Sequence, residues 1–157
     1  MTIPEDVNPA SQYFDLFSSP FYLIAHADYK YHEDLDKAVA KFGLDRTSYR
    51  VLTVLTQKNP MNIRDLSKCA LIKRSTVSRA VTRMRKEGWV ETEPNAVDAR
   101  TVDVRLTPKG DELTKRVMQL ASRQLKRALD GLDEADVRRM IASLQTIVEN
   151  LSRLPIE

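Results

Sequence analysis

The chain has 157 residues, of which 42% are hydrophobic and 30% are charged, a balance that excludes a disordered or a membrane-embedded chain. Its longest apolar runs have four or five residues, too few to cross a bilayer. The acidic N-terminus lacks the apolar core of an export signal, so we expect a cytoplasmic protein. The single cysteine, Cys69, excludes an internal disulfide framework and an all-cysteine metal site.

The net charge of +3 is unevenly distributed along the chain. Residues 62–110 contain 11 Lys and Arg against 6 Asp and Glu, whereas residues 1–61 have a net charge of −2 and residues 111–157 have none. A basic excess of this kind is typical of a segment that binds nucleic acid. A solvated basic face with no such partner would give the same balance.

Glycine, proline and short polar residues mark the predicted ends of the helices. In the first half of the chain, the spacing of apolar residues predicts helices from Pro20 to Gly43, from Asp45 to Asn59 and from Asn62 to Ala70. Ser18 and Ser19 are expected to cap the first helix, and Asp45 the second. Asn62 with Asp65 three residues later resembles a capping box for the third.

A change of period after the fourth helix predicts a β-hairpin. The helix spans Arg74 to Glu87, and Gly88 ends it. Residues 89–93 and 101–107 are then predicted as two strands, because apolar and charged side chains alternate along the second one. The polar segment 94–99 joins them as a hairpin loop.

Two long helices are predicted at the C-terminal end, from Pro108 to Gly131 and from Asp133 onwards. The last one carries a wide apolar stripe between Val137 and Leu151. Together with the first helix, these helices have more apolar surface than a small core can cover. A second copy of the chain would bury it, so we infer a homodimer.

This order of elements predicts a mainly α fold with a small β-hairpin wing. Helices two to four and the hairpin form a winged helix-turn-helix, flanked by N- and C-terminal dimerisation helices. We therefore divide the chain into an N-terminal arm with a dimerisation helix (1–44), a DNA-binding domain (45–107) and C-terminal dimerisation helices (108–157).

The fourth helix has the two faces that a recognition helix needs. One face is apolar and can pack against a neighbouring helix. The other carries small hydroxyls, which permit close approach, and arginines, which can form two hydrogen bonds with a guanine edge. The residues of this second face are Ser75, Thr76, Ser78, Arg79 and Arg83. Any exposed basic helix could share this pattern.

The hairpin tip holds the sequence Asp98-Ala99-Arg100. An arginine at this position can enter the minor groove, where the negative potential attracts it. The carboxylate of Asp98 could hold Arg100 in position. The alternative is a local turn pair that contributes little in water.

These elements together resemble the MarR family of multiple-antibiotic-resistance regulators. The matching motifs are Leu66, the run Arg74-Ser75-Thr76-Val77-Ser78-Arg79, the run Glu87-Gly88-Trp89-Val90, the pair Asp98-x-Arg100, and the run Leu106-Thr107-Pro108-Lys109-Gly110. The resemblance implies a homodimeric winged-helix transcription factor that reads an inverted repeat. It places Ser75, Thr76, Ser78 and Arg79 in the major groove, Arg100 with its support Asp98 in the minor groove, and Lys73, Arg74 and Arg83 on phosphates.

The chain departs from the family in the turn before the recognition helix. That turn usually contains glycine, whereas Leu71 stands there in this sequence. Leucine is costly in a left-handed conformation, so the turn is expected either to differ in geometry or to be strained.

The resemblance also implies a small-molecule effector, commonly a phenol or an aromatic carboxylate. Aromatic walls with a histidine and arginines would suit such an anion. The candidate ligand-binding residues are Tyr22, His26, Tyr29, Arg46, Tyr49 and Arg50. Alternatively, the tyrosines pack a dimer interface and the arginines face water.

Other kinds of site have weaker signals. Cys69 has Lys68 and Lys73 nearby, which leaves open a thiol-based redox switch. His26 and His32 lie on different faces of one helix, so we expect no metal site, and we expect no other cofactor. With no nucleophile–base pair and no phosphate-binding glycine loop, an enzyme is not expected.

We therefore expect a ligand-responsive homodimeric regulator, most simply a repressor, which a small effector such as an aromatic acid or its thioester releases from double-stranded DNA. The alternatives are a redox-sensing regulator that acts through Cys69 and a winged-helix protein-interaction module.

Overall fold

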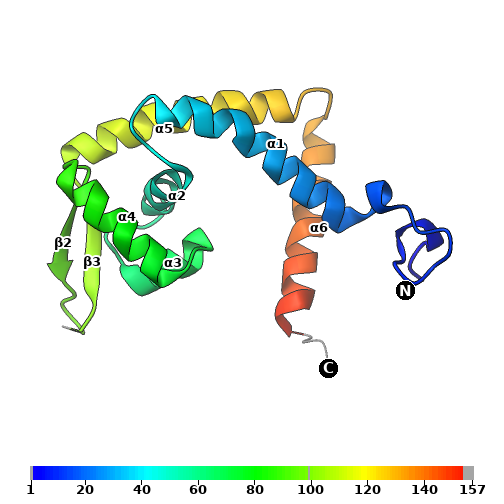
Figure 1. Ribbon diagram of the computed structural model, residues 1–157, viewed down its shortest axis with the longest axis horizontal. Coiled ribbons are helices and arrows are strands. Elements are labelled where there is room, and N and C mark those ends of the chain that lie inside the picture. The colour runs from blue at the N-terminus through cyan, green and yellow to red at the C-terminus, as the bar shows by residue number, and fades with distance from the viewer. Residues whose placement is uncertain (1, 99, 154–157) are drawn as a thin grey trace. The chain divides into compact units, whose positions relative to one another are not determined.

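The computed structural model describes residues 2–98 and 100–153. Within them, helices predominate and one small sheet forms the wing (Figure 1). The helices are α1 (Pro20–Ala40), α2 (Arg46–Leu55), α3 (Ile63–Ala70), α4 (Arg74–Lys86), α5 (Pro108–Ala128) and α6 (Glu134–Arg153), preceded by the short 3-10 turns Glu5–Val7 and Leu16–Ser18. The strands are β1 (Met61–Asn62), β2 (Val90–Pro94) and β3 (Val102–Leu106). The predicted fold class, a mainly α winged helix, is confirmed.

Side-chain caps open most of the helices where the sequence predicts them. The Asp45 Oδ1 atom accepts the backbone N–H of Ser48 at 2.8 Å, and the Asn62 Oδ1 atom accepts that of Asp65 at 2.9 Å. The predicted serine cap of α1 is wrong. Ser19 forms no such bond, and the hydroxyl of Ser18 donates instead to Asp15. Pro20 still opens α1, as expected.

Three helices end earlier than the sequence predicts. α1 ends at Ala40 rather than beside Gly43, α2 at Leu55 rather than at Asn59, and α5 at Ala128. The turns after α1 and α2 tighten, because each forms a backbone bond between residues three apart, such as Phe42 N–H to the Val39 carbonyl. The helical periodicity of the sequence does not show where an α-helix tightens into such a turn.

The sheet has three antiparallel strands in the order β1-β3-β2. β2 and β3 form the predicted hairpin, with Thr92 opposite Val104. β1 was not predicted, and it pairs Met61 with the same Val104 from the other side. The buried Val104 at the centre of the sheet therefore connects the wing to the chain that leads into α3.

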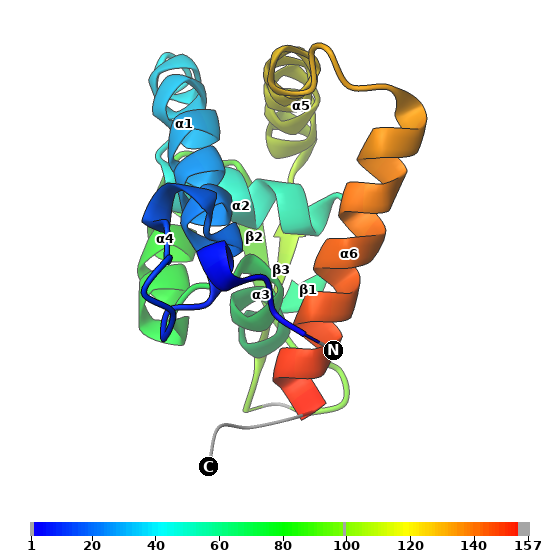
Figure 2. The ribbon, with the colours of Figure 1, turned by 90° about the vertical axis from the view of Figure 1, so that its right-hand side faces the viewer.

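The hydrophobic core is centred among α2, α3, α4 and the sheet, and Val39 of α1 and Val117 of α5 extend it. Figures 1 and 2 both show α2 above α3. The innermost side chains come from every element of this group: Leu52, Leu55, Leu66, Val77, Met84 and Val104. The predicted inward face of α4 is confirmed, since Val77, Ala80, Val81 and Met84 are all buried.

The turn between α3 and α4 keeps a backbone that normally uses glycine. Leu71 has φ 55° and ψ 41°, in the left-handed region. Its N–H bonds to the Lys68 carbonyl, and the next N–H, of Ile72, bonds to the Ser67 carbonyl, which is the bond pair of a Schellman motif. A leucine in this conformation costs about 1–2 kcal/mol. The expected strain is therefore present.

The start of α5 is joined closely to the end of the recognition helix and the start of the wing. The Thr107 hydroxyl donates to the Gly88 carbonyl at 2.6 Å, and the Thr107 N–H donates to the Trp89 carbonyl at 3.1 Å. A Cβ atom on Gly110 would overlap the carbonyl group of Trp89. Only glycine fits there, which gives a physical reason for the Thr-Pro-Lys-Gly sequence.

The chain separates into two compact units, one up to Ser122 and one from Arg123. The second unit contains the end of α5 and all of α6, and no residue of α6 is buried. Asp133 caps α6 as predicted, because its Oδ1 accepts the N–H of Asp136 at 2.7 Å. The division into domains 1–44, 45–107 and 108–157 stays a prediction.

Candidate nucleic-acid interface

The recognition helix α4 presents hydroxyl and basic side chains opposite its buried face. Ser75 and Arg79 are exposed, whereas Thr76 and Ser78 are half-buried. Their spacing places them along the outer side of one helix. The structure thus brings together the four side chains that the sequence assigns to the major groove.

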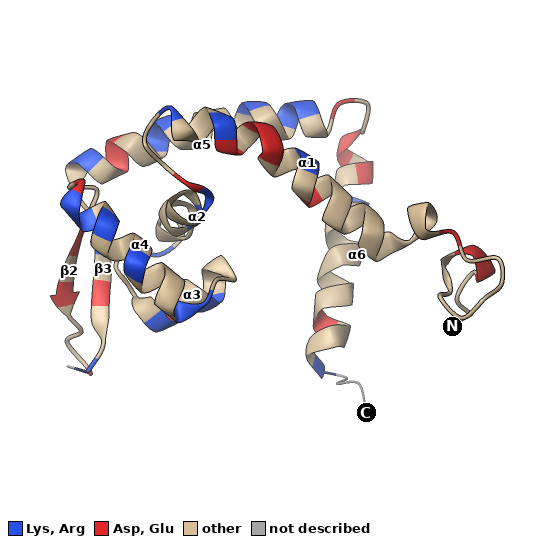
Figure 3. Cartoon of the chain, in the orientation of Figure 1, with Lys and Arg blue, Asp and Glu red and all other residues tan. Residues whose placement is uncertain are grey.

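Three cations at the start and middle of α4 are available to an anion. Lys73, Arg74 and Arg79 are exposed, and within residues 2–98 and 100–153 none of their side chains has a hydrogen-bond or ion-pair partner. Figure 3 shows Lys and Arg along α4 and α3, and the acidic residues of this region lie at the start of α3 (Asp65) and just after α4 (Glu87). Residues 66–86 contain no Asp or Glu, so this surface favours a polyanion.

Arg83 differs from its neighbours because its guanidinium already has partners. Its Nη2 atom donates to Asp45 Oδ2 at 2.5 Å and to Ser48 Oγ at 3.0 Å. These contacts tie the recognition helix to the start of α2. The predicted phosphate contact of Arg83 stays a prediction, but the structure gives this residue a second role that sequence reasoning missed. No local signal could have revealed it, since Asp45 lies 38 residues away.

The environment of Asp45 keeps its carboxylate charged. Burial is the largest influence and acts to raise its pKa, but hydrogen bonds from Ser48 and the charge of Arg83 outweigh it. The pKa of Asp45 therefore lies below its ordinary value. The ion pair with Arg83 is present at neutral pH.

The wing tip is organised by two side chains, Asn95 and Asp98. Asn95 donates to both carboxylate oxygens of Asp103, at 2.9 and 3.0 Å, and accepts the N–H groups of Val97 and Asp98. Asp98 accepts the backbone N–H of Arg100 at 3.0 Å. The support expected from Asp98 thus acts on the backbone of Arg100, whose side chain is exposed. Ala99 lies outside the described residues.

Tyr22, His26 and Tyr29, the residues of α1 that were predicted to bind ligand, lie in its N-terminal half. The rings of Tyr22 and His26 pack edge to face, with centroids 5.7 Å apart, and Tyr29 is exposed with the Lys30 ammonium 5.8 Å from its ring centroid. Asp36, which contacts α2, is 14 residues beyond Tyr22. That separation is about 21 Å along the helix.

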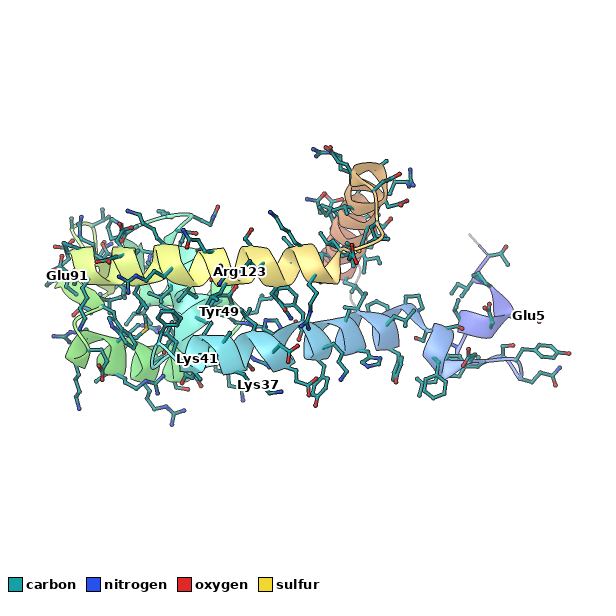
Figure 4. All side chains as sticks on the ribbon, turned by 90° about the horizontal axis from the view of Figure 1, so that it is seen from above. Glu5, Lys37, Lys41, Tyr49, Glu91 and Arg123 are labelled. Carbon is teal, nitrogen blue, oxygen red and sulfur yellow. The ribbon has the colours of Figure 1, made fainter. Side chains whose placement is uncertain are left out.

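The three predicted residues of α2 lie around the other end of α1. Arg46 donates to Asp36 at 2.5 and 2.9 Å, and this bond raises the pKa of Arg46. Tyr49 is buried, and Figure 4 shows it between α1 and α5. The Arg50 side chain reaches the Ala70 carbonyl at 3.5 Å. Arg46, Tyr49 and Arg50 therefore lie on neighbouring turns of α2 but contact different parts of the chain, and within one copy the structure does not bring Tyr22 to them.

A separate cleft lies along α5, and none of the six predicted residues lines it. Its volume is about 630 Å³. It has apolar residues and polar ones, including the ion pair between Asp111 and Lys115 at 2.7 Å. The lining residues are Leu55, Thr56, Asn59, Leu106, Asp111, Thr114, Lys115, Met118, Gln119 and Ser122. The sequence analysis missed this cleft, because its residues come from three elements and share no pattern.

The remaining candidates are placed as follows. Cys69 is exposed on α3, as a thiol sensor requires, and its redox role stays a prediction. His26 is exposed, whereas His32 is buried and its Nδ1 atom contacts the Asp28 carbonyl at 2.9 Å. Over the described part of the chain, no cluster of three metal-ligating side chains occurs. In the same part, no helix has the apolar length that a bilayer crossing requires.

Comparisons with known proteins identify the family of the chain. A model of the MarR family matches residues 42–101. The HTH-type transcriptional repressor IacR of Pseudomonas putida is 32% identical over 147 residues, which are 94% of this chain and 88% of IacR. A MarR-family regulator of known structure from Silicibacter pomeroyi superposes with a TM-score of 0.81 at 25% identity, over 90% of this chain and 96% of its own.

A second solved structure has the same fold at lower identity. BpsR of Bordetella bronchiseptica, whose DNA binding is regulated by 6-hydroxynicotinic acid, superposes with a TM-score of 0.76 at 19% identity, over 86% of this chain and 96% of its own. These relatives are regulators rather than enzymes. Given the winged helix, the exposed basic face of α4 and the extent of the match to IacR, the chain belongs to the MarR family of DNA-binding transcriptional regulators.

Proposed function

We propose that the protein is a homodimeric repressor that binds an inverted-repeat operator and leaves it when a small aromatic acid binds. α4 enters the major groove, and Arg100 at the wing tip enters the minor groove beside it. Repression is the activity of the relative IacR. The observation that carries the proposal is the outer face of α4. There Arg79 is exposed, has no partner among the residues that the structure describes, and lies between hydroxyls that are small enough for close approach.

The homodimer is supported by the apolar stripe of α6. Met140, Ile141, Leu144, Val148 and Leu151 are each more than one third exposed, although they share one helix face. A second copy is the simplest cover for such a stripe. Two recognition helices related by a two-fold axis would then reach major grooves about 34–36 Å apart.

The experiment that tests DNA recognition is selection from a random duplex library at moderate salt. We expect an enriched inverted repeat whose half-site centres lie about one helical turn apart. Binding without an enriched sequence would contradict the proposal and indicate contacts to the backbone alone. No binding would favour the protein-interaction module.

Two substitutions distinguish a DNA-binding protein from a protein-interaction module. Arg79→Ala should weaken operator binding by about 10-fold or more, since a bidentate contact to guanine contributes about 1–3 kcal/mol. Arg100→Ala should weaken it less. Lys37→Ala, on the exposed outer side of α1 (Figure 4), is the matched control and should bind as the parent does. If Arg79→Ala also binds as the parent does, the proposed role of α4 is wrong.

An anionic aromatic effector is supported by the regulation of BpsR by an aromatic acid and by Arg50 of α2, which has no carboxylate partner among the described residues and whose guanidinium contacts the Ala70 carbonyl. A ligand that favours one arrangement of the two recognition helices would release DNA by a shift in population. Operator release should be screened against hydroxylated benzoic, nicotinic and indole carboxylic acids and their thioesters. An unchanged response in the His26→Ala and Arg50→Ala variants would contradict the assignment of these residues.

A further inference from the structure

Leu71 combines backbone strain with exposure. In residues 2–98 and 100–153 it is the only residue other than glycine with a positive φ. Its side chain is 84% exposed and contributes nothing to the hydrophobic core. The two hydrogen bonds of its turn use backbone N–H groups, which glycine would supply equally well without strain. The fold therefore gives no reason for a leucine.

The position of Leu71 indicates where its side chain is used. It lies three residues before Arg74, the first residue of α4. In a helix-turn-helix the N-terminal end of the recognition helix contacts the base edges, so the preceding turn comes close to the same groove. Lys68 and Lys73, on either side of Leu71, are exposed cations. Residues 66–86 contain no carboxylate. The positively charged surface around Leu71 therefore favours DNA over a protein partner.

We propose that Leu71 is a specificity-determining residue, which packs against the C5-methyl group of a thymine in the operator. Thymine carries the only apolar group on the major-groove edge of the base pairs, and apolar side chains read it by contact. The inference rests on the proposed insertion of α4 into the major groove. It adds a base preference that the hydroxyls and arginines of α4 do not supply.

The test uses the operator found by selection, in which each thymine of a half-site is replaced in turn by deoxyuridine. This change removes the methyl group and leaves every hydrogen bond of the base pair intact. For the parent protein we expect one position at which the change weakens binding about fourfold, the effect of one buried methyl group. For Leu71→Gly we expect equal affinity for both operators at that position.

Two controls keep the result interpretable. Leu71→Gly should unfold at a higher temperature than the parent, because the strain of the turn is relieved. Lys68→Ala, one turn away, should weaken binding to both operators equally and keep the thymine dependence. If no thymine position is sensitive, or if Leu71→Gly keeps the sensitivity, the inference is wrong. The proposed function fails separately, when Arg79→Ala does not weaken binding.

Discussion

Helices α4 and α6 are both amphipathic, but the apolar face of α4 is buried whereas that of α6 is exposed. In α4, Val77, Val81 and Met84 are buried in the core of the same chain. In α6, the exposed fractions of the apolar stripe run from 37% at Leu144 to 64% at Val148. Covering such a side chain contributes about 1.5–3 kcal/mol. The comparison shows that a periodic sequence specifies an apolar helix face. It does not specify whether residues of the same chain bury that face.

The largest expected effect comes from a charge on the buried face of α4. Met84 is fully buried, so Met84→Asp should lower the free energy of unfolding by about 4 kcal/mol or more and leave little folded protein. Urea denaturation followed by circular dichroism measures the change. Thr82→Asp, with the same charge on the exposed side of α4, should stay folded. If Met84→Asp stays folded, the contrast between α4 and α6 is wrong, because the stability of the fold would then not depend on burial of the apolar face of α4.

The next largest effect concerns the junction that fixes α5 to the wing. Gly110→Ala should lower the free energy of unfolding by about 3 kcal/mol, because the new methyl group would overlap the Trp89 carbonyl. Gly131→Ala meets no atom within 4 Å but has a φ of 84°, so it should cost only about 1 kcal/mol. Equal losses in the two variants would mean that the junction is loosely packed.

A charge on the apolar stripe of α6 should act on assembly and leave the fold intact. We expect Leu144→Asp to weaken the proposed homodimer by about 100-fold, on the scale of 1.4 kcal/mol for each tenfold change, while its helical content stays that of the parent. Analytical ultracentrifugation over a concentration series measures the shift. Thr146→Asp lies on the opposite face of α6 and is the matched control. If Leu144→Asp unfolds instead, the stripe is covered within one chain, and the contrast with α4 disappears.

The smallest expected effect on stability concerns the ion pair between Asp45 and Arg83, which links α4 to the start of α2. The pKa of Asp45 is lowered in the folded protein, so the pair stabilises the fold above the unfolded value of about 3.9 and loses this effect as pH falls through the folded pKa. Both side chains are 51% exposed, which limits the contribution to about 1 kcal/mol.

The stability difference between the parent and Asp45→Asn should therefore stay constant from pH 8 to about pH 5 and shrink only in stronger acid. Thermal unfolding across this range measures it, and Asp34→Asn on the exposed side of α1 provides a comparison. A difference that shrinks already near pH 6 would mean that a group other than Asp45 controls the pair.

The sequence predicts the parts of this fold that depend on neighbouring residues. The Asn62 cap of α3 is a local pattern, and the structure has it: Asn62 accepts the N–H of Asp65, while the Asp65 carboxylate accepts the side-chain amide of Asn62 rather than its backbone N–H. The hydroxyls on the outer side of α4 are a local pattern as well. The strand β1 has only two residues and exists because β3 pairs with it from 41 to 43 residues away. Arg83 likewise finds Asp45 through the packing of α2 on α4. Contacts between residues that are far apart in the sequence cannot be predicted from the pattern of neighbouring residues.

The candidate ligand site shows the same limit. Helical spacing correctly places Tyr22 and His26 next to each other on α1, and it places Arg46 and Arg50 on α2. It cannot say which turn of a 21-residue helix lies beside α2. In the structure that turn contains Asp36, whose carboxylate engages Arg46.

The hydrogen bonds of Asn95 and Asp98 have a consequence for the thermodynamics of operator binding. A flexible loop that becomes fixed in the minor groove loses about 1–2 kcal/mol of backbone entropy per residue. In the wing, Asn95 already holds the N–H groups of Val97 and Asp98, and the Asp98 carbonyl already holds that of Thr101. These bonds hold the described wing residues on both sides of Ala99 in place in the free protein, so if Arg100 enters the minor groove as proposed, less backbone entropy is lost at these residues on binding.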